Sequence, residues 1–259
     1  MLANFRPRLM TAARFERCFA LPLHFWSAVL THDMWFVKPF VHHSMVTEGD
    51  SIMGQPLLKS TGFTYADYLA WPKDERWELI DGEAYAMAGP TLAHQTVVGE
   101  LFIEIGSFLR GKPCRVFVAP FDVRLPRGKE ADDDITTVLQ PDILVVCDPD
   151  KLDQRGVRGA PDWVIEVLSP STAAKDQIQK LAVYERAGVR EVWLVHPTDR
   201  VVSVYMLNAD RRYGKPAIHE TRETLTPGLF PDLLIDWGVV FANLPVSPIP
   251  VLTLPKDFP

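Results

Sequence analysis

The stretch Trp163-Val-Ile-Glu-Val-Leu168 places one carboxylate in the middle of a short apolar run. Its length and its β-branched residues predict a central β-strand. Because side chains alternate along a strand, Glu166 shares a face with Val164 and Leu168. Burying an ionised carboxylate costs several kcal/mol unless a cation or hydrogen-bond donors compensate it. Glu166 is therefore either a functional carboxylate or an exposed residue of an edge strand.

A second apolar run, Ile143 to Val146, is also of strand length and follows Pro141-Asp142 directly. Proline cannot donate to a sheet ladder, so Pro141 suits the start of a strand. Alone, a Pro-Asp pair is often only a turn. Two carboxylates on neighbouring strands, however, can share one hard divalent ion through their oxygens, as magnesium requires. Asp142 and Glu166 together therefore predict a metal site.

Outward from these two runs, the sequence predicts a mixture of helices and strands. Asp81-Gly82 is a strong two-residue hairpin signal, because both turn positions need positive φ. Apolar residues at helical spacing predict a long amphipathic helix that ends at Gly111. The mixture predicts an α/β (α+β mixed) fold with a central sheet flanked by helices. The expected elements are a helix at 64–69, a hairpin of 77–80 and 83–87, a strand over 115–125, a surface loop over 126–140, a loop between the two apolar runs, a helix ending at 186 before Gly188, and a hairpin of 191–195 and 201–207.

Length and composition favour one main domain with extensions. The chain has 259 residues, of which 47% are hydrophobic and 23% charged, which is a globular composition. We assign the domain to residues 56–245. Residues 1–55 show no clear hydrophobic period and are interpreted as an N-terminal extension, with Met45 or Met53 as alternative starts. Residues 246–259 are interpreted as a Pro-rich tail.

The net charge and the cysteine content indicate which cellular compartment and which binding partners to expect. The net charge of -6 argues mildly against a protein that grips nucleic acid by neutralising phosphates, although cations bound at an acidic metal site would offset it. Cys18, Cys114 and Cys147 form no Cys-x-x-Cys pair, so we expect no disulfide framework and a reducing cytoplasm. The apolar stretch from Cys18 to Leu30 falls short of the roughly 20 residues that span a bilayer. No membrane partner is expected.

Four motifs occur in a characteristic order between about residues 60 and 240. They are Glu78-Leu-Ile-Asp-Gly-Glu83, Gln140-Pro-Asp142, Glu166-Val-Leu-Ser-Pro-Ser-Thr172, and Lys180 followed by Tyr184-Glu-Arg-Ala-Gly-Val189 and Trp193-Leu-Val. The set resembles the Uma-type family of restriction endonucleases, within the restriction-endonuclease-like PD-(D/E)XK superfamily. This resemblance implies a restriction-endonuclease-like fold, a magnesium-dependent endonuclease in which manganese can substitute, and DNA as the substrate. It leaves a homodimer open.

The resemblance also places Glu78 beside the metal site, as a catalytic residue and as a ligand together with Asp142 and Glu166. The alternative is an exposed strand position, because the neighbours of Glu78 already supply apolar cover. Asp122 could approach the same site, and we rank it below Glu78. A lone helix histidine such as His94 is more often a surface or satisfied residue, so we do not expect it to be a ligand.

The sequence departs from the superfamily pattern at one position, because Leu168 stands where the pattern has lysine. Lys180, on the helix after the strand, is the candidate replacement and the fourth expected catalytic residue. Helical spacing places it on one face with Tyr184 and turns Ile178 and Leu181 towards the core. The alternative is a solvated helix lysine.

These residues predict hydrolysis of a DNA phosphodiester. A magnesium ion held by Asp142 and Glu166 would lower the pKa of a bound water, and Lys180 would stabilise the transition state. One alternative is a nucleic-acid-binding protein that keeps the nuclease fold but has lost the chemistry. Another is a metal-dependent hydrolase of a small phosphorylated substrate, which the acidic charge favours slightly and the absence of a Gly-rich phosphate loop weakens.

Overall fold

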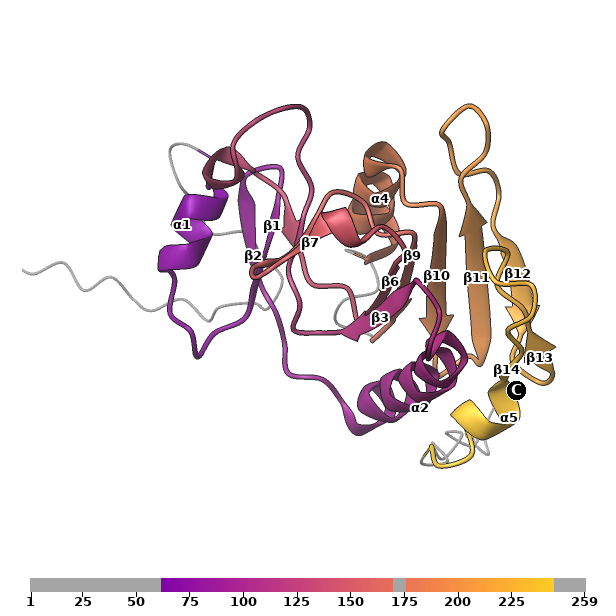
Figure 1. The fold of residues 1–259 in the computed structure, drawn as a ribbon. Coiled ribbons are helices and arrows are strands. Elements are labelled where there is room, and N and C mark those ends of the chain that lie inside the picture. Colours follow the sequence, from indigo (N-terminus) through magenta and orange to yellow (C-terminus); the bar gives the residue numbers. More distant parts are fainter. Residues whose placement is uncertain (1–61, 170–175, 245–259) are drawn as a thin grey trace, which may run out of the picture. The chain divides into compact units, whose positions relative to one another are not determined.

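The computed structural model describes residues 62–169 and 176–244, so the assignments of residues 1–55 and 246–259 lie outside the described part. The fold is mixed α+β, as predicted (Figure 1). The elements up to the first apolar run are α1 (Tyr65–Ala70), β1 (Trp77–Ile80), β2 (Glu83–Ala86), α2 (Leu92–Leu109), β3 (Arg115–Val118), β4 (Val123–Arg124), η1 (Asp132–Asp134), β5 (Val138–Leu139) and β6 (Ile143–Val146). Those that follow are η2 (Pro149–Lys151), β7 (Leu152–Asp153), β8 (Gly156–Arg158), β9 (Trp163–Val167), η3 (Asp176–Lys180), α4 (Leu181–Ala187), β10 (Glu191–His196), β11 (Val201–Met206), β12 (Ala217–Glu220), β13 (Thr224–Leu225), β14 (Ile235–Asp236) and α5 (Trp237–Val240).

The strands form two larger sheets and a small ribbon. The main sheet has six strands in the order β12-β11-β10-β9-β6-β3, and the second sheet has six in the order β2-β1-β5-β4-β8-β7. In the main sheet β9 and β10 are parallel, and the remaining neighbours are antiparallel. The parallel pair requires a crossover, which passes through η3 and α4. β9 therefore lies between β6 and β10, and the edge-strand alternative for Glu166 is wrong.

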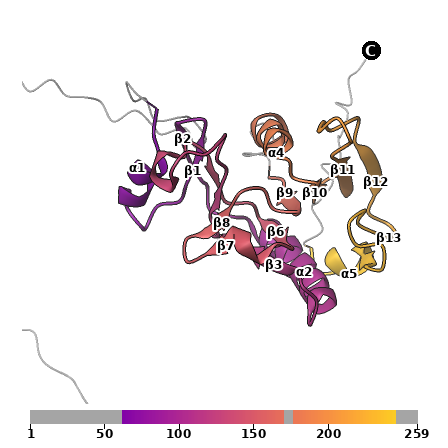
Figure 2. The same cartoon turned by 45° about the horizontal axis from the view of Figure 1, so that its top comes forward.

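The core divides according to the two faces of the main sheet. Trp163, Ile165 and Val167 pack with α2 and α5 in one apolar cluster, whereas Val164 and Leu168 pack with α4 in another. Figure 2 shows α2 and α4 on opposite sides of these strands. The alternation predicted for residues 163–168 is confirmed, and it directs Glu166 to the side that α4 covers.

Several local expectations were confirmed. The Asp81-Gly82 turn has positive φ at both residues, at 51° and 88°. Helix α4 ends at Gly188, which takes the left-handed conformation with φ of 90°. The long amphipathic helix is α2, which ends two residues before Gly111.

Three other expectations need correction. The single strand expected over 115–125 is two strands, β3 and β4, in different sheets, because Pro120 lies between them and cannot donate to a ladder. The expected surface loop 126–140 contains β5 and buries Ile135 completely. The expected loop between the two apolar runs contains the antiparallel pair β7 and β8.

The expectation of no disulfide framework is also wrong. Cys114 and Cys147 form a disulfide. They adjoin Arg115 and Val146, which face each other across the antiparallel pair β3 and β6. Strand pairing brings the two cysteines together, and this long-range contact leaves no trace in their spacing along the chain.

No helix within residues 62–169 and 176–244 is long and apolar enough to cross a bilayer.

Gly156 is required where β8 meets β4. Its φ is 113°, and a Cβ at this position would overlap the carbonyl oxygen of Asp122. We expect Gly156→Ala to lower the free energy of unfolding by about 2 kcal/mol or more, through the disfavoured backbone conformation and the steric overlap. Gly214→Ala is the matched control, because its Cβ would meet no atom within 4 Å. Equal urea midpoints for the two variants would contradict this account.

Candidate active site

Three charged side chains meet in the interior between the two sheets and α4. Glu78 on β1, Glu166 on β9 and Lys180 at the start of α4 are only 0%, 2% and 3% exposed. The Lys180 Nζ lies 2.8 Å from the Glu78 Oε1 and 3.1 Å from the Glu166 Oε1. We call these three residues the buried ionic cluster. They come from three separate parts of the chain.

Hydrogen bonds supply further compensation for this buried charge. The Tyr184 hydroxyl donates to the Glu166 Oε1 at 2.5 Å, and the backbone N–H of Gln140 donates to the Glu78 Oε1 at 3.1 Å. Burial, and then the negative charge of Glu166, raises the pKa of Tyr184 well above its usual value, so its hydroxyl keeps its proton. Each carboxylate thus has a cation and a neutral donor, which is the condition for burying it.

Asp142 lies next to this cluster and closer to solvent, with its side chain 16% exposed. Its Oδ2 accepts a hydrogen bond from the backbone N–H of Val167 at 2.8 Å and lies 3.0 Å from the His94 Nε2. Its own backbone N–H points to the Glu166 Oε2 at 3.4 Å. The ends of β6 and β9 therefore hold Asp142 and Glu166 side by side.

The donor set fits a hard divalent ion in its chemistry. Among the described residues the Asp142 Oδ1 accepts no hydrogen bond, and the Glu166 Oε2 lies on the side that faces Asp142. Magnesium commonly binds through one or two carboxylates and completes its shell with water and substrate oxygens. Within residues 62–169 and 176–244, no group of three His, Cys, Asp or Glu side chains is arranged to hold a metal ion. Asp142 and Glu166 are the two neighbouring carboxylates that the ends of β6 and β9 bring together.

The structure places three of the expected site residues in contact and the fourth beside them. The alternatives of an exposed Glu78 and a solvated Lys180 are wrong, since both side chains are buried. Helical spacing predicted both Ile178 and Leu181 in the core. Leu181 does pack against the core, but Ile178 is 70% exposed. The reason is that η3 is a π-helical turn with i→i+5 hydrogen bonds, so the α-helical spacing used for the prediction does not hold at Ile178.

Three further residues have a minor role or none in the prediction from the sequence, namely His94, Asp122 and Tyr184. His94 contacts Asp142, and its buried Nδ1 has no hydrogen-bond partner among residues 62–169 and 176–244. Asp122 lies apart from the cluster and accepts hydrogen bonds from Tyr68 and Gln140. Tyr184 bonds directly to Glu166. Tyr184 follows Lys180 by four positions, and the helix face that they share was a sequence signal of the role of Tyr184.

The chain is similar to known proteins in sequence and in fold. Residues 65–238 match the model of the Uma2 family, described as "Putative restriction endonuclease". A stretch of 147 residues is 28% identical to an uncharacterized protein of Synechocystis sp., covering 56% of this chain and 74% of that protein. A solved structure from Anabaena variabilis, described as a "putative nuclease belonging to DUF820", is similar in fold with a TM-score of 0.56 at 19% identity. The match covers 70% of this chain and 98% of that one.

Removing the cation from the buried ionic cluster leaves two carboxylates without their shared partner. We expect Lys180→Met to lower the free energy of unfolding by about 3–5 kcal/mol, as breaking a buried ion pair on one side does. Lys129→Met removes an exposed lysine and is the control. A Lys180→Met variant as stable as the wild type in urea denaturation would show that the three side chains do not depend on one another.

Proposed function

The chain belongs to the Uma2 family of restriction-endonuclease-like proteins, and from this premise we propose that it is a magnesium-dependent endonuclease that hydrolyses DNA phosphodiester bonds. The family supports a nuclease-like function. The observation that carries the finer proposal is the pairing of Asp142 with Glu166 beside a buried lysine. Two adjacent carboxylates and one cation are the groups that metal-assisted phosphodiester hydrolysis uses.

In this proposal Asp142 and Glu166 hold the ion through their carboxylate oxygens. When bound, magnesium supplies charge neutralisation at the phosphoryl oxygens and activation of a water. Backbone N–H groups fix the two carboxylates, since Val167 donates to Asp142 and Asp142 donates towards Glu166. Rigid ligands of this kind cost little reorganisation when the substrate binds.

Lys180 has two tasks in the proposed reaction. Its positive charge lies between the Glu78 and Glu166 carboxylates and offsets the cost of burying them. It also brings a cation close to the place where a phosphate would lie, which favours the additional negative charge of the transition state. In this arrangement Glu78, which pairs with Lys180, acts as a positioning residue. In this proposal Lys180, the last residue of η3, takes the place of the lysine that the superfamily pattern has two residues after Glu166.

Relaxation of a supercoiled plasmid tests the proposal. We expect the wild type to nick or cut the plasmid with magnesium and not with EDTA, and Asp142→Asn and Glu166→Gln to slow this by roughly 100-fold or more, because each weakens the hold on the ion. Asp232→Asn changes an exposed acid and is the control. If both site variants cut as fast as this control, the assignment of Asp142 and Glu166 to the active site fails. A wild type that binds DNA in a salt-dependent way but does not cut it would support an inactive nuclease fold.

His94 should act on the reaction through Asp142. A group that bonds to a metal ligand typically changes metal affinity or activity by about 10- to 100-fold when it is removed. We therefore expect His94→Ala to raise the magnesium concentration for half-maximal cleavage by that factor, measured at fixed plasmid concentration. His219→Ala is the matched control on β12. An unchanged magnesium requirement would mean that His94 does not orient Asp142.

A further inference from the structure

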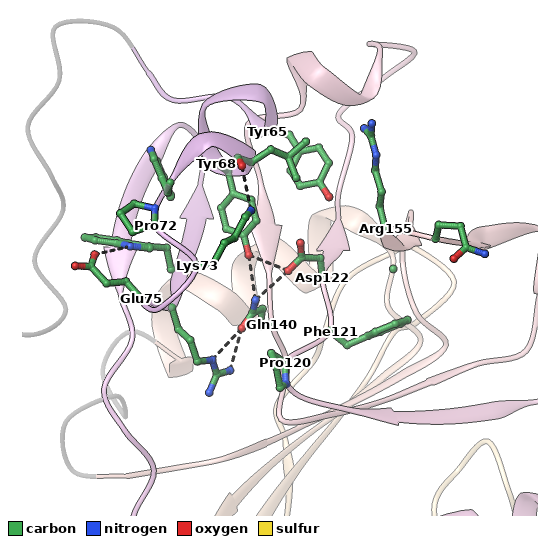
Figure 3. A pocket seen from close by; sticks show the side chains of 16 residues that line it. Tyr65, Tyr68, Pro72, Lys73, Glu75, Pro120, Phe121, Asp122, Gln140 and Arg155 are labelled. Carbon is green, nitrogen blue, oxygen red and sulfur yellow. Dashed lines mark hydrogen bonds between the residues drawn. The ribbon is translucent and has the colours of Figure 1, made fainter.

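A cavity of about 500 Å³ opens beside the second sheet (Figure 3). Its walls come from α1, from the segment that leads into β1, from the residues just before β4, and from the β7–β8 turn. This volume lies within the range of small-ligand sites. The lining combines aromatic rings, a polar floor and cations.

The aromatic wall is a continuous series of rings. Tyr65 and Tyr68 stack with their centroids 5.6 Å apart, Tyr68 and Trp71 lie 5.5 Å apart, and Trp71 and Trp77 also 5.5 Å apart. Phe121 lies on the other side of the cavity. Aromatic surfaces of this kind stack on nucleic-acid bases, which all present a flat π-face.

The polar floor is built from Tyr68, Asp122 and Gln140. The Gln140 Nε2 donates to the Tyr68 hydroxyl at 3.0 Å and to the Asp122 Oδ1 at 2.9 Å, and the Tyr68 hydroxyl donates to the same Oδ1 at 2.8 Å. The three side chains converge in Figure 3. Within the described residues, the Asp122 Oδ2 accepts no hydrogen bond. An acceptor fixed in this way suits an amino group on the edge of a base.

Cations surround the cavity although the whole chain carries a net charge of -6. Lys73, Arg76 and Arg155 line it, against the acids Glu75 and Asp122. Lys73 is exposed and donates to the Leu69 carbonyl oxygen, and the Arg155 side chain is 51% exposed and lies 3.6 Å from Asp133. Both are exposed enough to contact a phosphate at the entrance. Arg76 instead donates to the Gln140 Oε1 and holds the floor in place.

The cavity is connected to the candidate active site through two short segments. Trp77 lines the cavity and Glu78 is the next residue along β1. The Gln140 side chain lies in the cavity, while its backbone N–H donates to Glu78 and Asp142 follows two residues later. Because neighbouring side chains of a strand point to opposite faces, Trp77 and Glu78 lie on opposite sides of β1, and the cavity adjoins the site through the backbone of these two segments.

We propose that this cavity binds an unpaired nucleotide of the DNA strand, an inference that rests on the proposed function and extends it. The base stacks against the wall formed by Tyr68, Trp71 and Trp77, and its amino group donates to Asp122. The phosphates on either side contact Lys73 and Arg155. The enzyme would thus act on DNA with a single-stranded part, such as a flap, a gap or an unwound end.

Binding is measured by fluorescence anisotropy in EDTA, where metal-dependent hydrolysis cannot occur. The probes are labelled oligo-dC and oligo-dT, and a duplex of mixed sequence with each of its single strands. We expect the single strands to bind more tightly than the duplex. We also expect oligo-dC to bind at least roughly 5-fold more tightly than oligo-dT, because of these two bases cytosine alone carries an amino group. Asp122→Asn should abolish the preference for oligo-dC.

Further variants test the wall and the entrance. Trp71→Ala should weaken single-strand binding roughly 5- to 100-fold through the loss of stacking. Lys73→Ala and Arg155→Ala, which change exposed side chains and leave the fold intact, should weaken it and reduce its salt dependence. Lys215→Ala, an exposed lysine outside the cavity lining, is the control. Equal affinity for duplex and single strand, or Lys73→Ala and Arg155→Ala variants that bind like Lys215→Ala, would overturn the proposal.

Plasmid cleavage measured in parallel separates the two proposals. A wild type that cuts with magnesium but does not prefer single strands overturns the role of the cavity and leaves the proposed function standing. A wild type that prefers single strands through the cavity but never cuts overturns the proposed function instead.

Discussion

The contact of Lys180 with Glu78 and Glu166 is the interaction on which the site depends. These charges are almost completely buried, so each is tolerated only because the others are present. The cluster ties β1 of the second sheet to β9 of the main sheet and to α4. Asp142 then stands at the solvent side of this cluster, held by the N–H of Val167. Structure and proposed chemistry share one set of contacts, because the lysine that permits burial of Glu166 also supplies the cation.

Much of this arrangement could be predicted from short segments. The alternation within residues 163–168 correctly placed Glu166 on the side of Val164, because a strand in a two-faced sheet has a period of two. The spacing of Lys180 and Tyr184 correctly placed both on one helix face, and both contact Glu166. Local periodicity was sufficient here, since each signal lies within a single element.

Other features depend on contacts between distant segments. α-Helical spacing predicted that Ile178 is buried, but Ile178 is exposed. It lies in a π-helical turn, to which the periodicity of a regular α-helix does not apply. The cavity floor joins Tyr68, Asp122 and Gln140 from three parts of the chain, and nothing in their spacing indicates that they meet. A buried acid alone is also ambiguous. Glu191 is buried like Glu166, yet it accepts hydrogen bonds from Trp193 and from the backbone of residues 228 and 229, so its role is structural.

A crystal of the protein soaked in manganese is the most direct measurement of the central claim, because the anomalous signal locates the ion without reference to activity. The account predicts one peak beside the Asp142 and Glu166 carboxylates, which would hold the ion, with the Lys180 amine still between Glu78 and Glu166. A peak elsewhere, or none at the two carboxylates while manganese occupies other positions in the crystal, would contradict it.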